Sequence, residues 1–240
     1  MLIRSILLLT KDEVFATIVK YDYKNNTIIA KVGNKKAIIK PEDISIYQNR
    51  QNKGYIFTLL GTTLKFHVEN YSKDEGFILS RAKIMEEQSQ IYQKGDIVNA
   101  TVVSASDKAL YLEFAEGLSG IMYLNDITSA KLKKPNDLFN IGDKVKCVIT
   151  KKRGDLFELS RTKLYTQPLN IKNGKKVLCT ITKKLDDNSG FFVEVSKNPN
   201  YSGIFDLTED NISNKYSVGK NIRLKVIQIK PKKQLKLRTA

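Results

Sequence analysis

A short stretch of sequence recurs along the chain, and its spacing limits what the chain can fold into. Residues 79–84 (LSRAKI) return as residues 159–164 (LSRTKL), with a weaker echo at residues 235–239. A second landmark recurs in the same way, at residues 16–20, 100–104 and 179–183. Both sets repeat at intervals of about 80 residues, which suits one small β-barrel per repeat. The 240 residues therefore predict three tandem domains.

Polar and apolar residues alternate with a period of two inside each repeat, which is typical of β-strands with one buried face. The second repeat shows the pattern most clearly, and its predicted strands are residues 96–103, 109–114, 119–124, 144–149 and 156–160. In the third repeat the predicted strands are residues 176–181, 190–195, 202–205, 221–226 and 234–237. Turn-forming residues such as Gly117, Gly142 and Gly154 separate these segments.

These patterns predict an all-β protein of three tandem five-stranded barrels with short linker helices. The predicted domains are residues 1–86, 92–165 and 172–240, and the first is the most diverged. Residues 84–93 have the pattern of a helix and would link the first two barrels. A short helical turn is also expected near Pro135, between the third and fourth strands of the second repeat.

The balance of charge favours a polyanionic partner. The chain has 41 Lys and Arg against 25 Asp and Glu, a formal net charge of +16. Such an excess is typical of proteins that bind nucleic acid or an anionic surface. The excess is largest in residues 166–240, which carry 15 basic and 6 acidic side chains, a net +9. The alternative interpretation is compositional, because Lys, Asn and Ile are abundant in proteins of AT-rich genomes.

The sequence gives no support to several classes of function. Cys147 and Cys179 lie outside any CxxC pattern, so free thiols in a reducing cytoplasm are expected. The apolar residues 1–9 are too short to span a membrane and lack a signal-peptide cleavage site. His67 is the single histidine, and no phosphate-loop, GxSxG or HExxH motif occurs. We therefore expect a cytoplasmic, non-enzymatic protein with no cofactor, no catalytic or metal-binding residues, and no membrane or small-molecule partner.

Several short motifs stand in a fixed order in the second repeat. They are residues 94–98 (KGDIV), 119–122 (SGIM), 141–145 (IGDKV) and 158–161 (ELSR), and the third repeat has a further match at 218–222 (VGKNI). In this order they resemble the S1 domain, the RNA-binding OB-fold module of bacterial ribosomal protein S1. Three partial copies cover nearly the whole chain. The resemblance implies OB-fold barrels that bind single-stranded RNA, with a first barrel that docks on the small ribosomal subunit and later barrels that hold messenger RNA.

The resemblance also implies particular RNA-binding positions: aromatic side chains on strand two, a histidine on strand three and an arginine near strand five. Tyr111 and Lys108 occupy the strand-two positions of the second barrel, and Tyr123 occupies its histidine position. In the third barrel Phe192 keeps the strand-two aromatic, whereas Asp206 replaces the histidine. The arginine positions are Gly76, Leu156 and Gln234, so no barrel keeps that cation.

Other cations would then contact the RNA phosphates. The candidates are Lys131, Lys133, Lys134, Lys151, Lys152, Arg153, Arg223 and Lys225. The leading hypothesis is RNA binding in translation, with electrostatic capture followed by stacking on Tyr111, Tyr123 and Phe192. Two alternatives remain open at this point. One is a protein-interaction adaptor that docks through the first barrel and residues 1–9, and the other is an RNA-binding regulator acting off the ribosome.

Overall fold

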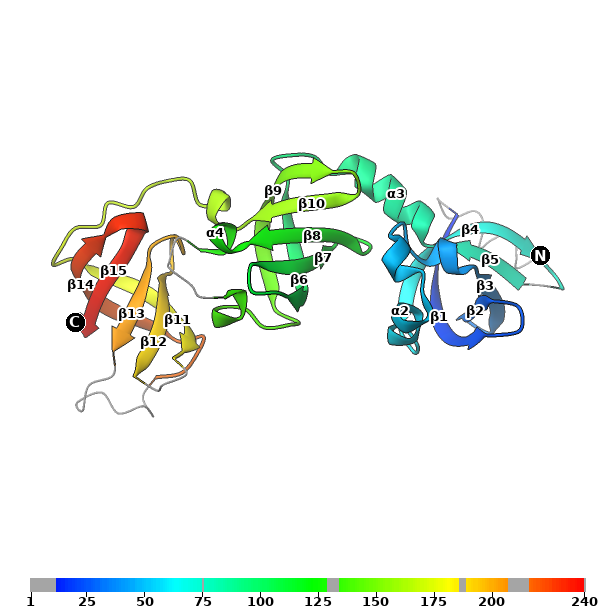
Figure 1. Ribbon diagram of the computed structural model, residues 1–240, viewed down its shortest axis with the longest axis horizontal. Helices are drawn as coiled ribbons and strands as arrows, with labels where there is room; N and C mark the ends of the chain where they lie inside the picture. The colour runs from blue at the N-terminus through cyan, green and yellow to red at the C-terminus, as the bar shows by residue number, and fades with distance from the viewer. Residues whose placement is uncertain (1–11, 75, 129–133, 186–188, 207–215, 240) are drawn as a thin grey trace. The chain divides into compact units, whose positions relative to one another are not determined.

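The protein consists mainly of β-strands arranged as three closed five-stranded barrels (Figure 1). The computed structural model describes residues 12–74, 76–128, 134–185, 189–206 and 216–239. By internal contacts the chain divides into two compact units, residues 1–92 with 115–118 and residues 93–114 with 119–240. The all-β class and the three barrels predicted from the repeat are confirmed.

The first barrel also has helices in its longest connection. Its strands are β1 (Glu13–Asp22), β2 (Thr27–Val32), β3 (Lys35–Ile39), β4 (Thr63–Ser72) and β5 (Gly76–Ser80). Between β3 and β4 lie η1 (Pro41–Ile44), η2 (Gln48–Arg50) and α2 (Lys53–Thr58), and α3 (Ala82–Ile91) follows β5. The sequence pattern did not predict α2, which begins where the Asn52 side chain accepts a hydrogen bond from the Tyr55 N–H at 3.0 Å.

The second and third barrels follow the predicted strands closely. The second contains β6 (Ile97–Ala105), β7 (Ala109–Phe114), β8 (Leu118–Tyr123), α4 (Leu124–Ile127), η3 (Pro135–Asp137), β9 (Lys144–Arg153), β10 (Leu156–Ser160) and η4 (Thr162–Leu164). The third contains β11 (Lys176–Lys184), β12 (Gly190–Val195), β13 (Ser202–Asp206), β14 (Asn221–Lys230), η6 (Pro231–Lys233) and β15 (Gln234–Thr239).

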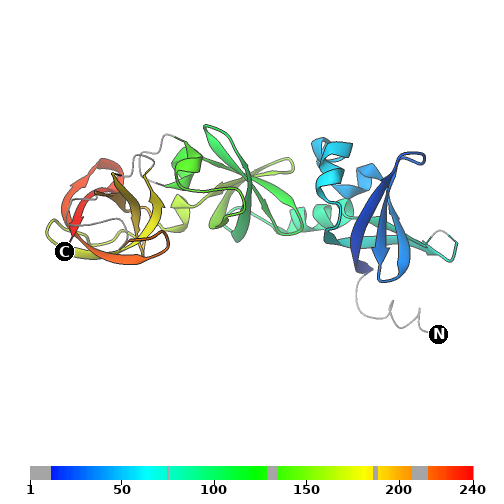
Figure 2. The ribbon, with the colours of Figure 1, turned by 90° about the horizontal axis from the view of Figure 1, so that it is seen from below.

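One strand order is common to all three barrels. Strand one lies between strands two and four, and strand five lies between strands three and four. The third and fifth strands pair in parallel, whereas the first strand pairs antiparallel with its two neighbours. Figure 2 shows the strands of the third barrel closing into a ring. This closed five-stranded arrangement is that of an OB-fold, and closure leaves no free sheet edge.

The parallel pairing explains the glycine in the repeated Ser-Gly of strand three. A Cβ on Gly203 would meet the carbonyl oxygen of Leu235, and a Cβ on Gly120 would meet the side chain of Leu159. Gly203 pairs with Leu235, and Gly120 pairs with Phe157, so the fifth strand approaches most closely at these glycines. Glycine is therefore favoured at this place in the second and third barrels, whereas the first barrel has Ala37 there.

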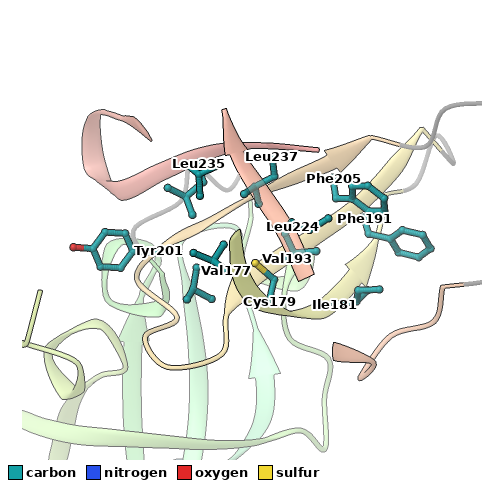
Figure 3. Packing of buried hydrophobic residues seen from close by; sticks show 12 residues of the cluster. Val177, Cys179, Ile181, Phe191, Val193, Tyr201, Phe205, Leu224, Leu235 and Leu237 are labelled. Atoms are coloured by element: carbon teal, nitrogen blue, oxygen red, sulfur yellow. The ribbon is translucent and has the colours of Figure 1, made fainter. Parts of the chain in front are cut away.

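Alternate residues of each strand fill the barrel interior. In the third barrel the core side chains converge from all five strands (Figure 3), with Phe191, Phe205 and Leu224 at most 2% exposed. Burying one such side chain stabilises the fold by about 1.5–3 kcal/mol. The residues on the opposite face of each strand are then free to contact something other than the core.

The repeated Leu-Ser-Arg has a structural role at the exits of the first and second barrels. Ser80 accepts a hydrogen bond from the Lys83 N–H at 3.3 Å, and Ser160 accepts one from the Lys163 N–H at 3.1 Å. Each bond closes the turn that leads from the fifth strand into α3 or η4. The most recognisable repeat in the sequence thus marks the chain leaving a barrel.

Candidate nucleic-acid interface

Two exposed tyrosines share the outer face of β7 and β8 in the second barrel. Tyr111, between two buried leucines of β7, is 42% exposed, and Tyr123, the last residue of β8, is 46% exposed. The Leu124 N–H donates to the Lys108 carbonyl at 3.0 Å, so the end of β8 lies beside the start of β7. Tyr123 and Tyr111 are therefore diagonal neighbours on one face, within reach of each other's side chains.

This pair has the chemistry of a stacking platform. An exposed aromatic ring stacks on any base, and each stacked base is worth about 1–3 kcal/mol. The structure brings together the two tyrosines predicted from the sequence, and Lys108 lies exposed in the turn before β7. We refer to Tyr111 and Tyr123 as the tyrosine platform.

The β9–β10 hairpin places cations near the platform. Lys151 and Lys152 are exposed, and Arg153 forms an ion pair with Glu158 in which Nε and Oε1 are 2.5 Å apart. Glu158 lies beside Ile121 of β8 in the parallel register, on the same side of the barrel as the platform. Arg153 therefore neutralises a carboxylate that would otherwise repel phosphate there.

The loop before η3 contains the remaining predicted cations of this barrel. Lys134 is exposed, and its backbone N–H donates to Asp137 Oδ2 at 2.9 Å, which holds the start of η3. Lys131 and Lys133 lie outside the described residues.

Strand two of the third barrel contradicts the prediction of an exposed ring at Phe192. Both faces of β12 are buried: Phe191 points into the core at 2% exposed, and Phe192 on the outer face is only 7% exposed. Lys183 pairs with Phe192 across β11 and β12, and its Nζ donates to the Asn136 carbonyl of the second barrel at 2.7 Å. The expected alternation holds, but the outer ring is not accessible for base stacking.

An ion pair joins this outer face of β12 to the second barrel. Glu194, two residues beyond Phe192 on β12, accepts from Arg161 at the exit of the second barrel, with N–O distances of 2.8 and 2.5 Å. The Arg161 guanidinium also donates to the Ile127 carbonyl at 3.3 Å and lies 5.4 Å from the Phe139 ring centroid. The two paired side chains are 14% and 4% exposed. Bidentate geometry with low exposure makes this a specific contact between the two barrels.

The third barrel separates its cations from its strand-two aromatic. Arg223 and Lys225 lie on the outer side of β14, which neighbours β11 and β15 and touches neither β12 nor β13 in the strand order. Asp206, at the end of β13, is exposed at the place that corresponds to Tyr123. The sequence did not predict this separation around the barrel.

One cation near strand five was missed from the sequence. Gly76, Leu156 and Gln234 open β5, β10 and β15, so the three arginine positions are structurally equivalent. Lys236, two residues after Gln234, points outward on the same face and is exposed. It lines a hollow of about 370 Å³ together with Phe192, Ile204 and Asp206. Counting two residues onward along the strand would have identified it.

Other kinds of site find no support in the described part of the chain. It holds no group of three or more His, Cys, Asp or Glu side chains arranged to bind a metal ion. None of its helices combines the length and apolar character needed to cross a membrane. Burial raises the pKa of both Cys147 and Cys179 to about 12, which makes them poor nucleophiles at neutral pH.

Comparison with known proteins identifies the barrel that holds the tyrosine platform. Residues 91–161 match the S1 RNA binding domain. The chain is 24% identical over 234 residues to a 4-hydroxy-3-methylbut-2-enyl diphosphate reductase of Clostridium acetobutylicum, which covers 88% of this chain and 35% of that protein. It is 23% identical over 192 residues to small ribosomal subunit protein bS1 of Rhizobium meliloti, covering 70% of this chain and 33% of that protein. The chain thus spans about a third of the length of these two relatives.

Several solved structures have a weak overall similarity to this chain. One is a multidomain protein with nucleic acid binding domains from Streptococcus pneumoniae, 12% identical with a TM-score of 0.28, covering 95% of this chain and 73% of that one. The match to the S1 RNA binding domain covers the second barrel, which holds the exposed tyrosines.

Proposed function

We propose that this chain binds single-stranded RNA through the tyrosine platform of the second barrel and acts in translation without catalysing a reaction. The observation that carries the proposal is a coincidence of two independent findings. The S1 domain match falls on residues 91–161, and that same barrel presents Tyr111 and Tyr123 side by side and exposed.

Binding would proceed from long-range attraction to local stacking. The net charge of +16 attracts a polyanion, and Lys108, Lys151 and Lys152 lie exposed in the barrel that holds the rings. Bases of an unpaired strand then stack on Tyr111 and Tyr123. Because stacking needs no particular base, we expect low sequence specificity.

The place of action is the cytoplasm, on or near the small ribosomal subunit. The likeness to protein bS1 supports this part of the proposal. Co-sedimentation tests it: the native protein should travel with small subunits in a sucrose gradient. An RNA-binding protein that stays at the top of the gradient would instead be a regulator acting away from the ribosome.

RNA binding is tested by fluorescence anisotropy with a labelled oligouridylate. The association constant should fall as KCl rises, with a log–log slope of about −0.7 for each phosphate neutralised on a single strand. Replacing both Tyr111 and Tyr123 by Ala should weaken binding about tenfold or more, since each stacked base is worth about 1–3 kcal/mol.

The control for this variant is Tyr23→Ala. Tyr23 is 66% exposed on the first barrel, so its loss removes an accessible ring without touching the platform. RNA affinity should stay within about twofold of the native value. Equal losses in both variants, or no loss in the double variant, would refute the platform.

A second candidate, a protein-interaction adaptor, is favoured by one feature of the first barrel. Phe15 is 67% exposed on β1, and Tyr23 and Phe57 are 66% and 42% exposed close together, with ring centroids 6.4 Å apart. Exposed aromatics of this kind are frequent in protein interfaces. Capture from a lysate with and without ribonuclease separates the two candidates, because an adaptor keeps its protein partner after RNA is digested.

A further inference from the structure

Three cations lie in a row across neighbouring strands of the third barrel. Lys176 on β11 pairs with Lys225 on β14, and Lys225 pairs on its other side with Arg238 on β15. Lys176 and Arg238 are exposed and Lys225 is half-buried between them. We call these three residues the cation row.

The other two barrels have no such row at the equivalent place. The corresponding residues are Ile97, Val148 and Ser160 in the second barrel and Glu13, His67 and Ser80 in the first, paired in the same way. In every barrel these three positions lie just before the β-bulge of the fourth strand. The fold therefore accepts uncharged residues here, and the cations of the third barrel are not required by the architecture.

No carboxylate lies among the outward-facing residues of the three strands around the row. On β11 and β14 these neighbours include Leu178, which is 45% exposed and pairs with Arg223, and Thr180, whose hydroxyl donates to Asn221 Oδ1 at 2.9 Å. On β15 the other outward residues are Gln234 and Lys236. Over these described residues the outer surface has basic and uncharged side chains and no acidic one.

A row of like charges has a cost in the free protein. Neighbouring strands are about 4.8 Å apart, and like charges directly opposite one another destabilise a sheet. An anion placed along the row would remove this repulsion, and a ligand with regularly repeated charge would meet several cations at once. The phosphodiester backbone of an unpaired nucleic acid has that property.

We infer that the cation row binds the phosphate backbone of single-stranded RNA, at a site separate from the tyrosine platform. The inference rests on the proposed function for the identity of the polyanion. Lys176, Lys225 and Arg238 supply charge without base recognition, so this contact would contribute affinity and no sequence preference. Joined in one chain with the platform, it would raise the overall affinity through effective concentration.

The test transfers the residues of the second barrel into the third. The triple variant Lys176→Ile, Lys225→Val, Arg238→Ser installs a row that the same fold already accommodates. The control, Lys172→Gln with Lys184→Gln and Lys197→Gln, removes the same charge from exposed positions outside the row. Both are titrated with labelled oligouridylate over a series of KCl concentrations.

The row variant should lose about two units of the log–log salt slope, since three phosphate contacts contribute about 0.7 each, whereas the control should lose less than one. If the two variants had equal slopes of log association constant against log KCl concentration, the inference would be overturned. If the row variant bound RNA as the native protein does, the row would bind some other anion, such as an acidic protein. The tyrosine-platform variant changes affinity with little change of slope, so a failure of the platform is distinguishable from a failure of the row.

A second measurement needs no RNA. Because the row repels itself, the row variant should melt at a higher temperature than the native protein at low salt, and the difference should shrink as salt is added. The control variant should show no such salt-dependent gain. A row variant that melts at the native temperature at every salt concentration would contradict the argument from repulsion.

Discussion

The second and third barrels have the same strand order but use the outer face of strand two in different ways. In the second barrel this face presents Tyr111 at 42% exposed, whereas in the third Phe192 is 7% exposed. The same face of the third barrel also carries Glu194, which pairs with Arg161 of the preceding barrel. An aromatic residue at a binding position can therefore stack on a base only where its ring is exposed.

The row of cations lies in the barrel without the exposed ring. The third barrel lacks an accessible ring on strand two but carries the cation row, and the second barrel has the rings but the uncharged Ile97, Val148 and Ser160 at the row position. Stacking and phosphate contact are the two components of sequence-tolerant binding to a single strand. If both proposals hold, adjacent copies of one fold would contribute different components of RNA binding.

Each of these barrels also contains one buried thiol, so their stabilities can be compared directly. Burial raises the pKa of Cys147 and of Cys179 from 9.0 to about 12, which lowers the thiolate fraction at pH 8 about a thousandfold. Native protein should react with iodoacetamide at least that much more slowly than protein in urea. Peptide mass spectrometry then gives the labelling rate of each barrel, and rapid labelling of either thiol would show that its barrel opens readily.

The same shift predicts a loss of stability in alkali. The unfolded thiols ionise near pH 9.0 but the folded ones only near pH 12, so the folded state is favoured below pH 9.0 and loses this contribution as the pH rises between the two values. Replacing each cysteine by Ser should flatten that part of the stability profile, because serine does not titrate there.

Phe192→Ala is expected to separate stability from RNA binding. Removing a buried phenylalanine should lower the free energy of unfolding by about 3 kcal/mol, measured by urea denaturation. RNA affinity should remain within about twofold, since the ring is covered. Tyr111→Ala is the matched opposite, with less than about 0.5 kcal/mol lost in stability and a clear loss of RNA affinity. If Phe192→Ala weakened binding more than Tyr111→Ala, the covered face would be the true platform.

Alternation and repetition predicted the strands well because both follow from the geometry of a closed sheet. Strands β7 and β10 have the predicted bounds, and the Gly at residue 120 falls where strands three and five approach most closely. The helix α2 was missed because its six residues are too few to show a helical period. It is defined instead by the Asn52 cap.

The site was harder to predict than the fold because accessibility depends on partners far away in the sequence. The alternation of Phe191 and Phe192 correctly indicates which ring enters the core. Nothing local to β12 shows that Glu194 would bind Arg161, 33 residues earlier. The cation row was likewise hidden, because Lys176, Lys225 and Arg238 become neighbours only through the strand register.

The smallest expected effect concerns Asp206, which stands in the third barrel where the second has Tyr123. Its carboxylate is exposed beside the hollow that Lys236 lines, so it should repel a phosphate entering there. Asp206→Asn should tighten oligouridylate binding about two- to fivefold at low salt, because an exposed charge interaction is worth up to about 1 kcal/mol. The gain should disappear at high salt, where such interactions are screened.

The control for this change is Asp74→Asn, which alters the net charge equally on an exposed turn of the first barrel. Anisotropy titrations of both variants at low salt separate a local effect from a general one. A gain confined to Asp206→Asn would mean that the RNA passes the end of β13. The third barrel would then contact the RNA both there and at the cation row. Equal gains would mean that the affinity responds to the total charge and that Asp206 has no local contact with the RNA.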